Sequence, residues 1–252
     1  MTDSSILRVA TYNVHRCLGI DWRRSEARIA EVIASMSVDI VSLQELSLRR
    51  ARFGGVDQAA MIARYLGWNV IFQPALRNVH EHFGDAIISR YPLRLVRVAE
   101  LPGKSPWYCR EPRIAIWAEA ETSLGAVQII NTHLGLGRSE RLLQAELLSS
   151  PEWLGSVPGN SPLVLLGDLN SIPGSQTYRC LLKVLHDVRE SVTANKLSTF
   201  PTYLPTWAVD HIFLNDALRA LSVRVYRTAR SWIASDHFPL VADLIKDIPA
   251  KP

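Results

Sequence analysis

Cysteine is scarce in this sequence, and so are lysine and long apolar runs. The 252 residues contain three cysteines, Cys17, Cys109 and Cys180, with no CxxC spacing. An odd number of scattered cysteines argues against a disulfide framework or a zinc knuckle. No apolar run approaches the roughly 20 residues of a membrane helix, and residues 1–7 lack the basic start and apolar core of a signal peptide. We therefore expect a cytoplasmic protein without a transmembrane segment.

Segments that would divide the chain are also missing. The sequence contains no linker, repeat or low-complexity tract, and 48% of its residues are hydrophobic. That content is sufficient for one large core. We therefore expect a single domain over residues 1–252, present as a monomer.

Arginine carries most of the positive charge. The 28 basic residues exceed the 24 acidic ones by four, and only 5 of the 28 are lysine. Guanidinium groups bind phosphate in a bidentate way, so an arginine-rich basic chain is compatible with a phosphorylated substrate. This charge does not distinguish nucleic acid from a phospholipid head group.

Hydrophobic periodicity predicts a mixed α/β protein. Helices are expected at Arg23–Met36, Gln58–Leu66, Ser139–Leu148 and Gln176–Leu185. Strands are expected at Leu7–His15, Asp39–Leu43, Asn69–Phe72, Ala86–Ser89, Leu93–Ala99, Arg113–Ala120, Ala126–His133, Leu163–Gly167, His211–Leu214, Val223–Thr228 and Leu240–Leu244. Adjacent strand runs with helices at intervals exclude a simple βαβ alternation. The pattern favours a four-layer αββα sandwich, in which two mixed, mostly antiparallel sheets pack face to face with helices outside.

Polar residues collect at the ends of the expected strands. In the segment VLLGDLNSIPG, an apolar run ends in Asp168 and Asn170, and a period of two puts both on one side of an extended chain. Similar residues are Asn13 in ATYNVH, Glu45 in SLQE, His133 in INTHL, Asp210–His211 in VDHIFL and Asp236–His237 in SDHFP. Any one of them is typical of a turn. Together they indicate one site, because an isolated carboxylate beside an apolar strand is costly to bury.

The donor types in this set favour a hard cation. Mg²⁺ takes oxygen ligands from one or two carboxylates, and the lack of nearby cysteine favours Mg²⁺, or Mn²⁺ as a substitute, over Zn²⁺. Glu45 suits the direct ligand, with Asn13 beside it as a neutral oxygen donor or orienting group. Asp168 and Asn170 are expected to hold and activate an attacking water.

Seven motifs follow one another along nearly the whole chain: TYNVH, LQE, FGDAIISRYPL, NTHL, LLGDLN, DHIFL and SDHFPLVADL. On these motifs the sequence resembles the endonuclease/exonuclease/phosphatase superfamily. Its members include pancreatic-type deoxyribonucleases, apurinic endonucleases, sphingomyelinases and inositol-polyphosphate phosphatases. The resemblance implies Asn13 and Glu45 at the metal, Asp236 as a further acid on the metal side, and Asp168 and Asn170 at the attacking water and the scissile phosphate.

The resemblance also implies roles for two histidines. His237 would lie against the phosphate, with Asp210 accepting a hydrogen bond from its ring and fixing its tautomer. His133 stands where the deoxyribonuclease and sphingomyelinase branches carry a second histidine, and it is a candidate acid for the leaving oxygen. Apurinic endonucleases lack that histidine, so abasic-site repair is disfavoured.

Several further residues have two interpretations. Arg110 belongs to the tripeptide REP, which pancreatic-type deoxyribonucleases carry before the corresponding strand, so it is either a phosphate contact or a surface arginine. Arg113 opens the strand and is expected only to flank the site. His15 follows Asn13 by two residues and either lines the pocket or caps the strand end. Asp85 has a candidate role on the substrate side.

Three functions remain open from the sequence. A nuclease-like, Mg²⁺-dependent phosphodiesterase that cleaves P–O bonds by in-line attack of water is favoured by the basic charge, the REP tripeptide and His133. A phospholipid head-group or small-phosphoester phosphodiesterase or phosphatase is favoured by the compact chain and by the aromatic segments Ser105–Tyr108 and Phe200–Trp207. A catalytically inactive binding module is disfavoured, because the set of acids, amides and histidines is complete.

Overall fold

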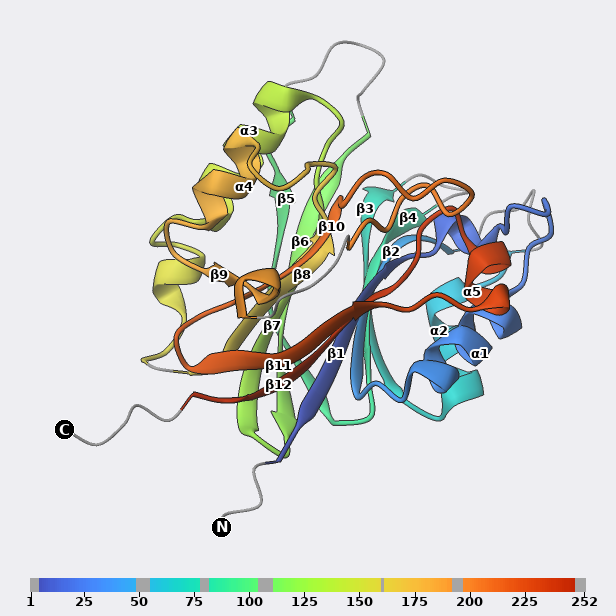
Figure 1. The fold of residues 1–252 in the computed structure, drawn as a ribbon, viewed down its shortest axis with the longest axis horizontal. Helices are drawn as coiled ribbons and strands as arrows, with labels where there is room; N and C mark the ends of the chain where they lie inside the picture. Colours follow the sequence, from blue (N-terminus) through green and yellow to red (C-terminus); the bar gives the residue numbers. More distant parts are fainter. Residues whose placement is uncertain are drawn as a thin grey trace.

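Two six-stranded sheets make up the centre of the molecule. The computed structural model describes residues 5–48, 55–77, 82–103, 111–159, 161–191 and 197–247. The first sheet contains β1 (Leu7–Asn13), β2 (Ile40–Leu48), β3 (Asn69–Arg77), β4 (His82–Ser89), β11 (Leu218–Val225) and β12 (Leu240–Lys246). The second contains β5 (Leu93–Leu101), β6 (Arg113–Thr122), β7 (Gly125–His133), β8 (Leu163–Asp168), β9 (His186–Asp187) and β10 (Asp210–Leu214). Their spatial orders are β11-β12-β1-β2-β4-β3 and β5-β6-β7-β8-β10-β9 (Figure 1).

One parallel strand pair lies in the middle of each sheet. β1 pairs with β2, and β7 pairs with β8, while the other strand pairs within the described residues are antiparallel. Parallel neighbours require a crossover connection. Here α1 (Glu26–Met36) connects β1 to β2, and α3 (Arg138–Leu148) connects β7 to β8. The two strands of each parallel pair therefore end side by side, and polar side chains from both strands can meet there.

Helices cover the outer faces of the two sheets. The first sheet is covered by α1, α2 (Gln58–Leu66) and α5 (Ala229–Ala234), and the second by α3 and α4 (Gln176–Leu181) (Figure 1). Short 3-10 turns occur at η1 (His15–Cys17), η4 (Leu154–Ser156) and η5 (Val188–Ser191). This arrangement confirms the expected αββα sandwich. Within the described residues, no helix combines the length and the apolar character needed to cross a bilayer.

The apolar core has three layers. Between the sheets lie buried residues of both, among them Val9, Ile40, Ile87, Ile116, Ile129, Leu166 and Leu240. A second layer packs α1, α2 and α5 on the first sheet, and a third packs α3 and α4 on the second. Because the strands β1, β2, β7, β8 and β10 are buried along most of their length, their ends are held on a close-packed base.

Capping residues explain where several helices begin. The helix expected from Arg23 begins instead at Glu26, because the Ser25 hydroxyl accepts a hydrogen bond of 3.1 Å from the Arg28 amide. The helix expected to run to Leu185 ends at Leu181. Sequence periodicity missed β9 and α5, which have only 2 and 6 residues, too few to show a period.

Gly167 allows β7 and β8 to lie close together just before the site. Its φ is +153°, and a Cβ at this position would overlap the carbonyl oxygen of Thr132 on β7. Only glycine leaves room for that approach. The glycine of LLGDLN thus brings Asp168 next to the end of β7, where it pairs in register with His133.

β2 differs from the expectation at Glu45. The predicted strand ended at Leu43, but β2 continues to Leu48 through a register shift between Leu43 and Leu46 in its pairing with β4. Glu45 lies in this bulge with a φ of +62°. A bulge redirects a side chain out of the regular alternation, and a left-handed backbone costs a non-glycine residue on the order of 1–3 kcal/mol. The surrounding sheet therefore holds Glu45 in a conformation that a regular strand would not provide.

Candidate active site

The predicted site residues converge where the two parallel pairs end. Asn13 ends β1, His133 ends β7, Asp168 ends β8, and Asp210 begins β10. Asp168 pairs in register with His133 on one side and with Asp210 on the other. The sheets pack face to face, and the Asn13 amide of the first sheet donates a 3.0 Å hydrogen bond to Asp168 Oδ2 of the second. Both sheets therefore contribute to one site.

Asp168 is the centre of the hydrogen-bond network. It is 1% exposed. Its Oδ1 accepts a hydrogen bond of 2.8 Å from the Asn170 amide N–H, and its Oδ2 lies 3.6 Å from His133 Nε2 and 3.7 Å from His237 Nε2. Burial raises the pKa of Asp168 above its ordinary value, partly opposed by the charge of His237. A carboxylate in this environment is a better proton acceptor than one on the surface.

Carboxylates surround His237. Its Nδ1 lies 2.9 Å from Asp210 Oδ2. Burial lowers the pKa of His237, but the negative charges of Asp210 and Asp168 outweigh burial and raise the pKa to about 10. The ring is therefore a cation at neutral pH, and its Nδ1 donates to Asp210. This is the carboxylate–histidine pairing that the sequence motifs implied.

An arginine contacts the other histidine. His133 is buried, and its Nδ1 lies 2.9 Å from Arg113 Nη1. Burial lowers the pKa of His133 far below its ordinary value, and the charges of Arg113 and His237 lower it further. Because a guanidinium group can only donate, Nδ1 must accept and the ring proton belongs on Nε2. His133 is thus a neutral imidazole that presents an Nε2–H group to the site.

Two hydrogen-bond donors meet beside Asp168. Asn170 Nδ2 lies 3.0 Å from His133 Nε2 and also donates to the Leu134 carbonyl at 2.9 Å. With the ring proton on Nε2, both nitrogens are donors and do not hydrogen-bond each other. An anionic oxygen in front of the pair would accept from both, as in an oxyanion hole.

Arg113 lies closer to the site than the sequence indicated. It was expected only to flank the site, but its side chain is 6% exposed and contacts His133 on one side and Glu111 Oε2, at 3.2 Å, on the other. A signal was present in the sequence. The β6–β7 hairpin pairs Thr122 with Gly125 and continues to Ala115 with Thr132. That register brings the first residue of β6 to the end of β7.

Glu45 and Asn13 provide oxygen donors suited to a hard cation. Asn13 Nδ2 donates to Glu45 Oε1 at 3.0 Å, and Asn13 Oδ1 accepts the His15 amide N–H at 3.0 Å. Among the described residues, no arginine, lysine or histidine forms an ion pair with Glu45. A half-buried carboxylate without a cationic partner is consistent with a metal ligand. Asn13 orients Glu45 and Asp168 through its Nδ2, so the orienting interpretation of Asn13 fits these contacts.

Asp236 and His15 lie at the edge of the site beyond Asn13. His15 Nδ1 is 3.8 Å from Asp236 Oδ1. The Ser235 hydroxyl donates to the Asn13 carbonyl at 2.8 Å and lies 3.3 Å from the same Asp236 oxygen. Ser235 therefore fastens the Asp236–His237 segment to the end of β1.

A second buried acid lies beneath Glu45. The Glu45 amide N–H donates to Asp85 Oδ1 at 3.3 Å. Burial raises the pKa of Asp85 to about 7, opposed in part by Arg113. Asp85 thus supports the backbone of the bulge, and a role on the substrate side stays a prediction.

Three of the buried groups, Asp168, Asp210 and His237, have ligand atoms within 4.8 Å of one another. Such a cluster could suggest a metal. The 2.9 Å contact to Asp210 occupies Nδ1 of His237 and one oxygen of Asp210, so two of the candidate ligand groups are already hydrogen-bonded to each other. The cluster is better described as a charged hydrogen-bond network, and the metal expectation remains with Glu45.

His211 supports the site from the opposite face of β10. Successive strand residues point to opposite faces, so Asp210 faces the site and His211 does not. His211 is fully buried, and its Nε2 lies 2.7 Å from the carbonyl oxygen of Ser171, the neighbour of Asn170. Its Nδ1 lies 3.0 Å from Arg189 Nη1, so Nε2 carries the proton and donates to Ser171. This contact holds the loop in which Asn170 has a φ of +48°.

Not every predicted residue can be placed. Asn13, Glu45, His133, Asp168, Asn170, Asp210 and His237 belong to one hydrogen-bonded network, with Asp236 and His15 at its edge. Arg110 lies outside the described residues, and so does the segment Ser105–Tyr108.

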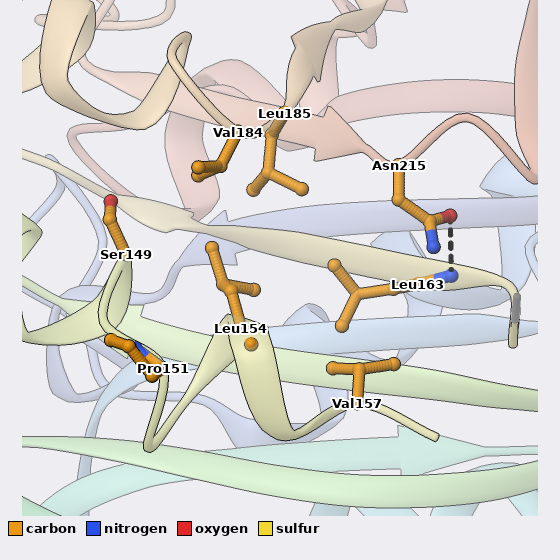
Figure 2. A pocket seen from close by; sticks show the side chains of 9 residues that line it. Ser149, Pro151, Leu154, Val157, Leu163, Val184, Leu185 and Asn215 are labelled. Carbon is orange, nitrogen blue, oxygen red and sulfur yellow. Dashed lines mark hydrogen bonds between the residues drawn. The ribbon is translucent and has the colours of Figure 1, made fainter. Parts of the chain in front are cut away.

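A separate hollow lies at the other end of β8. It has a volume of about 300 Å³ and is lined mainly by apolar side chains, including Leu154, Val157, Leu163 and Leu185 (Figure 2). Asn215 Oδ1 accepts a 3.0 Å hydrogen bond from the Leu163 amide there. Leu163 begins β8 and Asp168 ends it, so this hollow is remote from the carboxylates and histidines. Among the described residues that line it there is no carboxylate, histidine, arginine or lysine.

The fold and the site define a class of protein. Carboxylates, amides and histidines gathered at one end of an αββα sandwich are the arrangement of a phosphoester hydrolase. The sequence profile of the Endonuclease/Exonuclease/phosphatase family matches residues 10–237. The chain therefore belongs to this family, which confirms the resemblance seen in the motifs.

Similar proteins span the whole chain. YbhP of Escherichia coli strain K12, an uncharacterized protein, is 26% identical over 260 residues, which cover 96% of this chain and 98% of YbhP. A family member from Bacteroides vulgatus has a TM-score of 0.78 and 21% identity, covering 96% of this chain and all of that one. A mannosyl-6-phosphatase from Bacteroides thetaiotaomicron has a TM-score of 0.73 and 22% identity, covering 95% and 99%. Because both identities are below 25%, the two structures establish the fold of this chain and nothing about its substrate.

Proposed function

We propose that this protein is a Mg²⁺-dependent phosphodiesterase of nuclease type, which cleaves a P–O bond by in-line attack of water. The observation that carries the proposal is the convergence at Asp168 of a cationic His237, a neutral His133 and the backbone N–H of Asn170. Phosphoryl transfer depends mainly on positioning and charge stabilisation, and this set of groups supplies both. Mn²⁺ is the expected substitute for Mg²⁺, and the cytoplasmic location and the monomeric state remain predictions.

In this proposal Asp168 is the base. Its buried Oδ2 accepts the proton of the attacking water, which its raised pKa favours. The imidazolium of His237, held by Asp210, stabilises charge that develops on a non-bridging oxygen. His133 and Asn170 donate hydrogen bonds from the adjacent side. Because His133 is neutral, it contributes its Nε2–H group as a hydrogen-bond donor to the leaving or non-bridging oxygen.

A divalent cation would be held by Glu45, with Asn13 and Asp236 beside it. When bound, it would act as a Lewis acid on a phosphoryl oxygen. Asn13 links the two functions of the site, because the same amide nitrogen donates to Glu45 at the metal and to Asp168 at the water, both at 3.0 Å.

The test is a hydrolysis assay of the purified protein. Bis(p-nitrophenyl) phosphate, plasmid DNA, single-stranded DNA, RNA, phospholipid and sugar phosphates are compared with Mg²⁺ and with excess EDTA. We expect Mg²⁺-dependent cleavage of diesters and its loss on chelation. Activity that survives full chelation contradicts the metal assignment, and cleavage of monoesters alone contradicts the diesterase assignment. Nucleic-acid cleavage should weaken steeply with added salt.

A phospholipid head-group phosphodiesterase is the second candidate. It is favoured by the exposed aromatic side chains next to the site. Phe200 lies 4.5 Å from His237 between ring centroids, and Trp207, which is largely exposed, lies 5.9 Å from Phe200. An apolar surface this close to the catalytic histidine suits a substrate embedded in a bilayer.

A further inference from the structure

Large apolar side chains are exposed along one side of the active site. Trp22 is 84% exposed, and Tyr203, Leu204, Trp207 and Trp232 are between 46% and 72% exposed. These five residues are called the aromatic rim below. They occur on three segments: the loop 18–24, the loop 199–207 and helix α5. Contiguous exposed apolar surface is uncommon on a monomeric protein and usually marks an interaction site.

Hydrogen bonds join the three segments to each other and to the site. The Ile20 amide N–H donates to the Ile233 carbonyl at 3.0 Å, which connects the first loop to α5. Trp232 Nε1 donates to the Thr202 carbonyl at 3.1 Å, which connects α5 to the second loop. The Thr202 amide in turn donates to the Asp236 carbonyl at 2.9 Å, next to His237. The aromatic rim is therefore continuous with the catalytic segment.

The loop that carries Trp22 is braced. Leu18 and Arg24 form an isolated β-bridge, and the Arg28 guanidinium binds both carboxylate oxygens of Asp21, at 2.7 and 3.1 Å. Trp22 itself has a φ of +61°, a conformation that is costly for a bulky residue. The strain is confined to the backbone of this residue, and its side chain faces solvent with little contact to the rest of the protein. A strained and almost fully exposed tryptophan held on a braced turn indicates a surface prepared for a partner.

Positive charge accompanies the aromatic rim. Arg23 follows Trp22, and Arg227 lies just before α5; both are exposed. Two further arginines are paired with acids, Arg28 with Asp21 and Arg230 with Glu31, so the positive charge of the rim comes from Arg23 and Arg227. Protein surfaces that bind at the boundary between lipid head groups and acyl chains combine tryptophan, tyrosine and leucine with flanking arginine. The bases of a nucleic acid would stack on the aromatic rings, but they would gain nothing from contact with the exposed Leu204.

We propose that the aromatic rim docks this protein on the surface of an anionic phospholipid bilayer. Its aromatic and leucine side chains enter the head-group region, and its arginines lie against lipid phosphates. The active site then faces the layer of lipid phosphodiesters. Docking is a binding property and does not depend on the hydrolytic function proposed above.

The test is co-sedimentation of the full-length protein with vesicles. Phosphatidylcholine vesicles with and without phosphatidylglycerol are compared for the native protein and for the double variant Trp22→Ala/Tyr203→Ala. We expect binding that requires phosphatidylglycerol and that falls about tenfold or more in the double variant, because two large aromatic side chains no longer enter the bilayer. Trp22 and Tyr203 are largely exposed and lie outside the catalytic network, so diester hydrolysis and Tm should be unchanged.

Tyr65→Ala is the matched control. Tyr65 is also 60% exposed but lies on α2, outside the aromatic rim, so this variant should bind vesicles like the native protein. Absence of native binding to anionic vesicles overturns the proposal, and so does equal binding by the double variant. Trp22-dependent binding to DNA in place of vesicles also overturns it and identifies a nucleic-acid surface. Vesicle binding is measured without turnover, so its failure is distinct from failure of the hydrolysis assay.

Discussion

The surroundings of His237 and of His133 give different charge states to the same kind of side chain, a cation at His237 and a neutral ring at His133. His237 lies between Asp210 and Asp168, and its pKa rises to about 10. His133, at a similar depth, contacts Arg113, and its pKa falls far below the ordinary value. Both rings lie within 3.7 Å of one oxygen, Asp168 Oδ2. The partner on Nδ1 therefore decides whether each histidine acts as a cation or as a neutral donor.

This difference gives the site two complementary halves. The His237 half supplies positive charge where phosphate oxygens are expected, whereas the His133 half supplies neutral hydrogen-bond donors. If both rings were cations, their repulsion would cost stability in a buried site. Arg113 prevents this by fixing His133 as an acceptor on Nδ1.

Removing His237, the cationic side chain, or Asp168, the base shared by both histidines, should lower kcat the most. We expect His237→Ala and Asp168→Asn each to lower kcat by about 10²–10³-fold or more, judged from the loss of a single group that stabilises charge in other enzymes. The folded structure should persist, which circular dichroism checks. Near-normal turnover by either variant, with metal present, would contradict the assignment of both residues.

Removing the charge of Asp210, which is hydrogen-bonded to His237, should lower kcat by less. Asp210→Asn removes the charge that raises the pKa of His237 and leaves the ring in place, so we expect kcat to fall about 10- to 100-fold at neutral pH. The loss should be smaller at low pH, where the ring is protonated without help. A loss that does not vary with pH would show that Asp210 acts through structure alone.

Removing the guanidinium group of Arg113, which donates to His133, should lower kcat by less again. Arg113→Met removes the donor on Nδ1, so we expect the pKa of His133 to rise and kcat to fall about tenfold. Arg113→Lys keeps the charge but not the planar geometry and serves as the matched variant. A pH–rate profile for Arg113→Met that coincides with that of the native protein would show that Arg113 does not control His133.

The opposite pKa shifts of the two histidines should also appear in the stability of the metal-free protein. A folded-state pKa of about 10 means that the folded form retains the His237 proton while the unfolded form, near 6.5, loses it. This contribution is complete below about pH 6.5 and is lost as pH rises toward 10. His133 has the reverse sign, since its lowered pKa favours folding above about pH 6.5 and opposes it below. Urea unfolding in EDTA at pH 7 and 9.5 should show a smaller decline for His237→Ala than for the native protein.

Much of the fold and of the site could be predicted from the sequence. Alternating and helical apolar patterns identified the sandwich, and polar residues after apolar strands identified the site, because strand ends meet in this topology. Glu45 was predicted beside Asn13, and the structure brings the two side chains into contact, but the bulge that holds Glu45 was not predicted, since nothing local marks a register shift. The Arg113–His133 contact depends on strand register, and the His211–Ser171 contact depends on loop packing, which no local pattern encodes.

Nitrogen-15 NMR of the histidine rings tests the central comparison most directly. At pH 7.5 we predict that both nitrogens of His237 carry protons and that only Nε2 of His133 does. A neutral His237, or a His133 that is charged or protonated on Nδ1, would contradict the division of the site into a cationic half and a neutral half.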